Sequence, residues 1–197
     1  MRNVVPIVNP LSKNQIELMA TSILSEVQPE VLKSNCSVDI EYIYDVYIPE
    51  KFHIKTGYTD LGEIGPNVLG YTDASTKESY VEKSLYESNE QGVIRRCRST
   101  IAHEGFHCIE HVPVLNFFKS ISRKEDDVLF RTDRRNIPAY IDPEWQAWIF
   151  AGALLMPTNL VRKHYERGAS IRNLAEIFDV NPAFVRVRLS KLGLKTN

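Results

Sequence analysis

The stretch His103-Glu104-Gly105-Phe106-His107 fits the pattern H-E-x-x-H. Residues four apart on an α-helix lie on one face, one turn apart, so two histidines at this spacing can bind one metal ion. The glutamate between them can take a proton from a water molecule at that metal. The stretch therefore predicts a helix that carries a zinc-hydrolase site. His103 and His107 are the expected ligands and Glu104 the general base.

The flanking residues favour this helix. From Val93 to His111 there is no proline, and the only glycine is Gly105. Four apolar residues recur at steps of three, four and seven and form one stripe: Ile94, Cys97, Ile101 and Cys108. At about 100° per residue, the two histidines point roughly a third of a turn away from that stripe. We expect one helix face in the core and another that presents two imidazoles.

A catalytic zinc needs a third protein ligand. The metzincin extension is absent, because Glu110 and Pro113 stand where it requires Gly and His. His111 continues the four-residue series but lies two turns from His103. That is roughly 12 Å along the axis, too far for both to share one ion. The third ligand must come from another segment.

The segment that begins at Ile141 is the best source. Asp142 suits a helix N-cap and Pro143 the first helical position. Glu144 shares a face with Ala147 and Ala151, whose small side chains let two helices approach closely. Glu144 is therefore the preferred third ligand. Four other carboxylates remain as weaker alternatives: Asp126, Asp127, Asp133 and Asp142.

Three blocks of the chain resemble the ImmA/IrrE metallopeptidases, which are gluzincin-type zinc peptidases. The first is residues 101–107 followed by His111. The second is residues 144–157, against a family pattern close to E-x-x-A-N-x-F-A-x-x-L-L-M-P. The third is residues 174–180, with Val185, Arg188, Leu189, Leu192 and Gly193 after it. The resemblance implies one Zn²⁺ per chain, held by His103, His107 and Glu144.

Trp148 departs from that pattern, because it occupies the usual Asn position one turn after the third ligand. Indole can only donate a hydrogen bond, so Trp148 cannot orient a metal-binding histidine as an acceptor. We expect another carboxylate or a backbone carbonyl to do so. His111, Tyr80 and Tyr140 are candidates for a supporting or oxyanion-stabilising role.

The expected fold is α+β: a mostly helical, zincin-like metallopeptidase with a small three-stranded antiparallel or mixed sheet. Strands are expected at residues 52–58, 68–72 and 79–86, and the last is the candidate edge strand for an extended substrate. Residues 1–157 would form the core. Residues 158–197 would form a C-terminal helical hairpin, packed on the core and resembling helix-turn-helix.

Composition agrees with a soluble cytoplasmic protein. Net charge is −1, so no general attraction to nucleic acid or anionic membrane is expected. The first ten residues lack the apolar core of a signal peptide, and no apolar run is long enough to span a bilayer. The three cysteines, Cys36, Cys97 and Cys108, are odd in number and lack metal-type spacing, which indicates a reducing compartment. Cys97 and Cys108 lie on the apolar stripe, so we expect them to be packing thiols.

The resemblance suggests a substrate: a helix-turn-helix repressor cut at a specific site to release stress, phage or mobile-element genes. Two alternatives are a regulatory binding protein that keeps a zinc site without cleaving its partner, and a DNA-binding regulator that uses the C-terminal hairpin. We expect a protein partner, no direct nucleic-acid contact and no membrane association.

Overall fold

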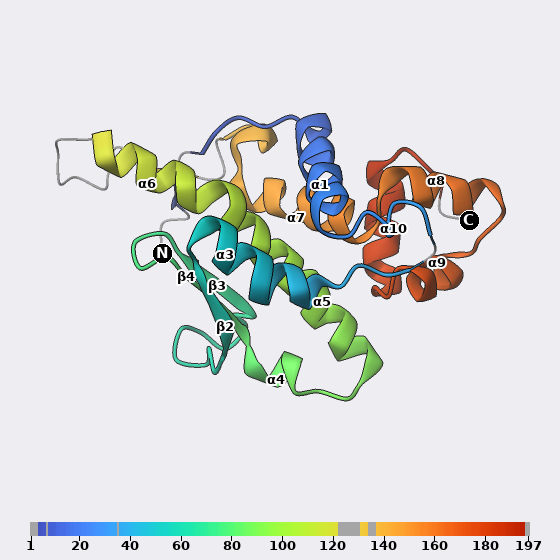
Figure 1. Cartoon of the computed structure of the whole chain (residues 1–197), viewed down its shortest axis with the longest axis horizontal. Coiled ribbons are helices and arrows are strands. Elements are labelled where there is room, and N and C mark those ends of the chain that lie inside the picture. The colour runs from blue at the N-terminus through green and yellow to red at the C-terminus, as the bar shows by residue number, and fades with distance from the viewer. Residues whose placement is uncertain (1–3, 7, 35, 122–130, 134–136, 196–197) are drawn as a thin grey trace.

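The computed structural model describes residues 4–6, 8–34, 36–121, 131–133 and 137–195 (Figure 1). One long helical run crosses the molecule and carries the H-E-x-x-H motif. It consists of α5 (Gln91–Phe106), a π-helical turn η2 (His107–His111) and α6 (Val112–Ile121). Pro113 is the second residue of α6 and follows the π-helical turn.

Two helices pack on one side of this run. The buried helix α7 (Pro143–Leu155) lies against α5, and α1 (Lys13–Val27) lies against α7. Asp142 caps α7 by accepting a hydrogen bond from the Glu144 backbone N–H, 3.0 Å away. Ser12 and Gln15 form a capping box at the start of α1. The expected cap at Asp142 is therefore present.

The other side of α5 is covered by a mixed three-stranded sheet in the order β2-β4-β3. The strands are β2 (Lys55–Thr59), β3 (Gly70–Asp73) and β4 (Glu78–Glu82). β4 runs parallel to β2 and antiparallel to β3. Three segments complete this side of the fold: α2 (Ile40–Tyr42) and the π-helical η1 (Ile43–Tyr47), which lead into α3 (Ile48–Phe52).

The prediction that residues 79–86 form an edge strand is wrong. The segment expected at residues 79–86 forms the central strand β4, because β2 and β3 pair with its two sides. β4 also ends at Glu82, whose carboxylate accepts from the Ser84 N–H and starts the short helix α4 (Lys83–Tyr86). The first strand is expected at residues 52–58. Phe52 instead ends the helix α3, His53 adopts a left-handed backbone, and β2 begins at Lys55.

The remaining elements lie at the two ends of the molecule. β1 (Val4–Pro6) pairs with β5 (Arg131–Asp133), and a 3₁₀ turn η5 (Ala139–Ile141) leads into α7. Three helices gather at the C-terminal end: α8 (Thr158–Glu166), α9 (Ile171–Ile177) and α10 (Pro182–Lys191) (Figure 1). One hydrophobic cluster includes residues on both sides of Pro157. No described helix is both long and apolar enough to cross a membrane.

Burial of the motif helix goes further than its apolar stripe indicates. Every residue of α5 from Cys97 to Phe106 is buried, because α7 covers the histidine side and β3 and β4 cover another. His103 is only 6% exposed and Glu104 only 7%. The expected open imidazole face is therefore a covered one, reached through a cleft.

Candidate metal centre

His103, His107 and Glu144 meet where α5 and α7 cross. Ala147 and Ala151 are fully buried at this crossing, so the two helices approach closely enough for Glu144 to reach the motif. One ligand atom from each of the three residues lies within 4.8 Å of the others. The alternatives Asp126 and Asp127 lie outside the described residues, as does most of the charged stretch around them. Asp142 is used as the cap of α7.

The spacing of these atoms fits a zinc ion. The two Nε2 atoms are 3.1 Å apart, and the Glu144 oxygens lie 3.2 Å from His103 Nε2 and 3.4 Å from His107 Nε2. Ligands at zinc distances in a tetrahedral arrangement are separated by roughly 3.3 Å. Two imidazoles and one carboxylate are also a donor set found in catalytic zinc sites. The residues present therefore match the requirements of the metal.

A chain of hydrogen bonds begins at Nδ1 of His107 and continues through His111 to Gln146. That Nδ1 lies 2.8 Å from Nδ1 of His111, and His111 Nε2 lies 2.8 Å from Oε1 of Gln146. The Gln146 amide nitrogen donates to the backbone carbonyls of Asn9 and Tyr140, both at 2.8 Å. Since both amide N–H groups are used, the Gln146 oxygen must face His111.

The direction of each bond follows from that oxygen. A carbonyl oxygen only accepts, so His111 Nε2 carries the proton. Burial, followed by the charge of nearby His107, lowers the pKa of His111 to about 3, so its ring is neutral near pH 7 and Nδ1 is an acceptor. His107 Nδ1 is then the donor. Nε2 is then the His107 nitrogen that faces His103 and Glu144, and in the neutral ring it is the nitrogen left to bind a metal.

The π-helical turn η2 places His111 behind His107. Its closing bond runs from the Val112 N–H to the His107 carbonyl, five residues back. A π-helical turn takes more residues than an α-helical turn. His111, four positions after His107, therefore lies more nearly in line with His107 along the helix axis. The group that orients His107 is therefore the buried imidazole of His111, one of the expected supporting candidates, rather than a carboxylate or backbone carbonyl.

Trp148 lies against His103, the second candidate histidine. Its ring centroid is 4.5 Å from that of His103. Nδ1 of His103 is buried and has no hydrogen-bond partner among the described residues. The substitution of Trp for the usual Asn thus leaves His103 without the acceptor that His107 has.

The general-base candidate is held by the sheet. Thr72 of β3 donates to Glu104 Oε2 at 2.7 Å, and Thr72 lies 2.8 Å from the Ser79 hydroxyl of β4. Tyr44 donates to Ser79 at 2.9 Å. Each hydroxyl has a single proton, so the protons run one way, from Tyr44 through Ser79 and Thr72 to the carboxylate.

Gly70 allows Glu104 to lie against β3. A Cβ added at Gly70 would be only 2.6 Å from the Glu104 Cγ, closer than two carbons can approach. The backbone of an unpaired sheet edge therefore runs directly beside the carboxylate. Neither Gly70 nor Thr72 is marked in the sequence by more than strand-like surroundings.

A cleft of about 410 Å³ opens onto this centre. His103, Glu104 and Glu144 line it, together with the approach to β3, residues 67–70. Arg96, one of its wall residues, is exposed and supplies a positive charge that the sequence did not single out. Among the described wall residues, the oxyanion candidates Tyr80, Tyr140 and His111 do not appear. Tyr140 instead contributes its backbone carbonyl to Gln146.

Electrostatics couples the three ligand residues. Burial opposes ionisation of Glu144, but hydrogen bonds from His103 and His107 outweigh it, so the pKa of Glu144 is lowered. Burial likewise opposes protonation of His107, yet its bond to Glu144 and the charge of Glu104 raise its pKa. The two buried thiols, Cys97 and Cys108, have their pKa raised to about 12 by burial. They are packing groups, as expected.

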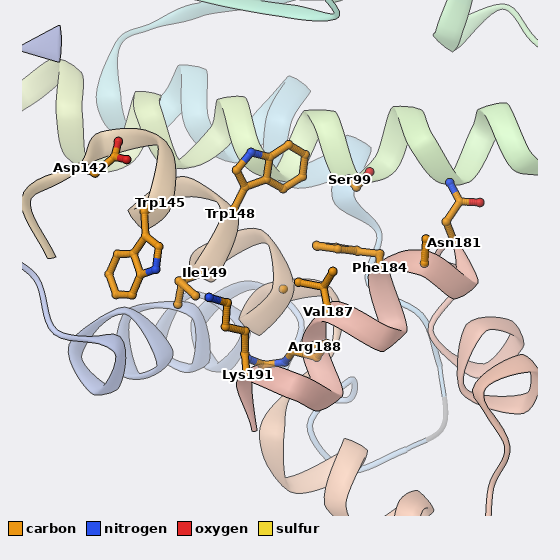
Figure 2. A pocket seen from close by; sticks show the side chains of 12 residues that line it. Ser99, Asp142, Trp145, Trp148, Ile149, Asn181, Phe184, Val187, Arg188 and Lys191 are labelled. Carbon is orange, nitrogen blue, oxygen red and sulfur yellow. The ribbon is translucent and has the colours of Figure 1, made fainter. Parts of the chain in front are cut away.

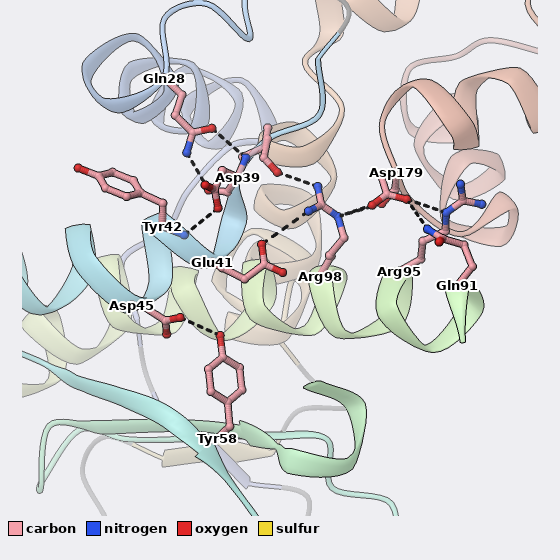
Figure 3. A network of polar contacts seen from close by, with 11 residues as sticks. Gln28, Asp39, Glu41, Tyr42, Asp45, Tyr58, Gln91, Arg95, Arg98 and Asp179 are labelled. Carbon is pink, nitrogen blue, oxygen red and sulfur yellow. Dashed lines mark hydrogen bonds and ion pairs between the residues drawn. The ribbon is translucent and has the colours of Figure 1, made fainter. Parts of the chain in front are cut away.

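The C-terminal helices are tied to the motif helix by a polar network (Figure 3). Asp179, in the turn between α9 and α10, accepts from Gln91 at 2.8 Å and from Arg95 Nε at 2.9 Å. Arg98 donates to the Asp179 carbonyl at 3.0 Å and to the Val38 carbonyl at 2.7 Å. The turn of the hairpin is thus held against α5, two turns from His103.

A family model described as Peptidase_M78, IrrE N-terminal-like domain, matches residues 49–190. The chain belongs to this family. The match to Peptidase_M78 includes the helix of the motif, the helix of Glu144 and most of the C-terminal helices, and it supports the ImmA/IrrE resemblance and a peptidase-type role.

A solved structure described as a Mycobacterium tuberculosis transcriptional regulator is similar to this Peptidase_M78 chain. The TM-score is 0.58 at 16% identity, covering 90% of this chain and 46% of the other. The chain thus spans about half the length of that structure, and the likeness concerns the fold. No curated protein matches the chain.

Proposed function

We propose that this chain is a zinc-dependent endopeptidase. The observation that carries the proposal is the meeting of His103, His107 and Glu144 at ligand spacing beside Glu104. His103, His107 and Glu144 would hold the zinc, and His111 with Gln146 would hold His107 in the binding tautomer. Zinc bound here supplies Lewis acidity, which polarises a peptide carbonyl and makes a water molecule easier to deprotonate.

Glu104 takes the proton of the attacking water and passes it to the nitrogen of the leaving amine. The Thr72 hydroxyl occupies one carboxylate oxygen, Oε2, so the other oxygen, Oε1, is the one available for proton transfer. Arg96 is the cleft cation suited to a developing negative charge or to a substrate carboxylate.

The substrate would bind as an added strand. β3 has an unpaired edge, since only β4 pairs with it in the described sheet. Gly70 lets that edge pass beside Glu104. An extended polypeptide paired with β3 would present its carbonyls to the three ligand residues, gaining affinity from backbone hydrogen bonds.

The substrate we propose is a helix-turn-helix repressor. The resemblance to the ImmA/IrrE metallopeptidases supports it, and the fold likeness to a protein described as a transcriptional regulator is consistent with it. Cleavage would release the genes that the repressor silences. We place this activity in the cytoplasm.

Metal analysis and one matched variant test the proposal. Purified protein should contain about one zinc per chain, and Glu144→Ala should lose it. Glu104→Gln should keep the zinc and abolish cleavage of a repressor that the wild-type protein cuts. If Glu104→Gln still relieves repression in cells, the protein acts by binding its partner rather than by cutting it.

Direct DNA binding is the weaker alternative. Arg188, one of the basic residues of the hairpin, is 3% exposed and donates to Glu17 and to the Met156 carbonyl. It is therefore not available for phosphate contacts. Arg186 is exposed, and duplex affinity that falls steeply with salt and weakens in Arg186→Ala would favour this alternative.

A further inference from the structure

A second concave surface lies between α7 and α10, with a volume of about 550 Å³. Figure 2 shows Trp145 and Trp148 of α7 together with Phe184 and Val187 of α10 around it. Trp148 is 47% exposed and Val187 52% exposed. Large apolar side chains that stay in contact with water inside a concavity mark a place where a ligand is bound. We call this surface the α7–α10 groove.

The groove adjoins the metal-site cleft. Ser99 and Trp148 line both of them. The Trp148 ring centroid lies 4.5 Å from that of His103 and 6.0 Å from that of Phe184. One indole therefore lies between the two, with His103 on one side and Phe184 on the other.

The charges around the groove argue against an acidic or basic occupant. Arg188 lines it, but its guanidinium is taken up by Glu17 and the Met156 carbonyl. Asp142 lines it, but its carboxylate caps α7. Lys191 is the remaining lining residue that carries a charge. Away from Lys191, a charged side chain placed against the tryptophan and phenylalanine faces would lose hydration without a matched partner.

We infer that the α7–α10 groove binds a large apolar side chain, aromatic or branched, of the polypeptide substrate next to the bond that is cut. The inference rests on the proposed function, because a carbonyl at the metal ligands brings its neighbouring side chain to Trp148. An aromatic ring offers the area and flat shape that pack against Trp148 and Phe184. Trp148 then sets specificity as well as covering His103.

Small hydroxamates can test this without a known substrate. The chain has two tryptophans, so Trp145→Phe makes Trp148 fluorescence a report on binding. Zinc-loaded Trp145→Phe protein would be titrated with hydroxamates that carry a benzyl, hydrogen or carboxymethyl side chain. One series would place that side chain on the acyl side of the zinc-binding group, and a second series on the amide side.

In one of the two series the benzyl compound should bind about tenfold or more tightly than its hydrogen counterpart. Phe184→Ala and Val187→Asp, each in the Trp145→Phe background, should reduce that preference to about threefold or less. Phe117→Ala removes an exposed aromatic ring from α6, outside the groove, and should leave the preference unchanged.

Equal affinity for the benzyl and hydrogen compounds in both series would overturn the inference while the proposed function stands. Tightest binding by the carboxymethyl compound would also overturn it and would point to Lys191. Failure to bind either zinc or the hydrogen compounds would instead overturn the proposed function, and this inference with it.

Discussion

Nδ1 of His107 lies 2.8 Å from Nδ1 of His111. The buried, neutral imidazole of His111 therefore accepts a hydrogen bond from His107, a proposed metal ligand. A carboxylate in that position would add a negative charge to the site. An imidazole that is itself held by Gln146 fixes the tautomer without adding charge. The zinc centre we propose would thus carry only the charge of Glu144 among its ligands.

Loss of this support should weaken metal binding. Gln146→Ala and His111→Phe should each reduce zinc affinity about 10–100-fold, because His107 would no longer be fixed as the Nδ1–H tautomer. Competition against a chelator of known affinity measures the effect, and circular dichroism checks the fold. Affinities within twofold of wild type would show that His107 needs no such support.

The hydrogen bond can also be observed directly. In ¹⁵N-labelled protein, a proton on His107 Nδ1 should give a scalar coupling across the bond to Nδ1 of His111. The coupling should vanish in Gln146→Ala if the amide sets the direction of the chain. A proton found on His111 Nδ1 instead would reverse the assignment.

Gly70→Ala should abolish peptidase activity with little loss of zinc. The new methyl group would push Glu104 away from β3, since its Cβ would lie 2.6 Å from the Glu104 Cγ. Cleavage rate and zinc content are measured on the same preparation. Gly92→Ala is a matched control, because a Cβ there meets nothing within 4 Å. An active Gly70→Ala enzyme would mean that Glu104 does not act from its present position.

Stability should fall in acid through Glu17. Burial alone would raise the pKa of this carboxyl, but Arg188, with Thr158, outweighs burial and holds it below the ordinary 4.5. A lowered folded-state pKa stabilises the protein above pH 4.5, and that contribution is lost as pH falls through the folded-state value. The difference in unfolding free energy between wild type and Glu17→Gln should therefore be present at pH 7 and shrink below about pH 4. A pH-independent difference would contradict this.

Asp179 should matter for stability more than its partial exposure indicates. Its side chain is 28% exposed but pairs with Arg95 and Arg98, whose side chains are 17% and 7% exposed. Asp179→Ala should cost about 1–2 kcal/mol, because Arg95 and Arg98 lose their carboxylate partner while Arg98 keeps its bonds to the Val38 and Asp179 carbonyls. Asp179→Asn tolerates the left-handed backbone at φ 49° and should lose about half as much. Thermal unfolding of the two variants separates the charge from the backbone contribution.

The helices could be predicted from the sequence because the patterns that indicate them are local. The four-residue spacing of His103 and His107 and the cap at Asp142 both act within one turn, and each element formed where expected. The small alanines on the Glu144 face also placed that carboxylate at the motif.

Other features depend on contacts between distant segments. The position of β4 at the centre of the sheet depends on which strands pair with it, and alternation along one strand does not record this. Gln146 is a neutral polar residue in an apolar helix, and its role follows from Asn9, Tyr140 and His111 around it. The π-helical turn breaks the 3.6-residue period on which the assignment of faces relied.

That turn also makes the long helical run sensitive to length. The additional residue in η2 shifts the phase of α6 relative to α5, although the two continue along one path. Deleting a single residue between His107 and His111 would let the turn close as an α-helix and would put His111 only three residues after His107. Every ligand would remain in the sequence, yet the imidazole behind His107 would be gone. Insertions and deletions there should be far less tolerated than substitutions.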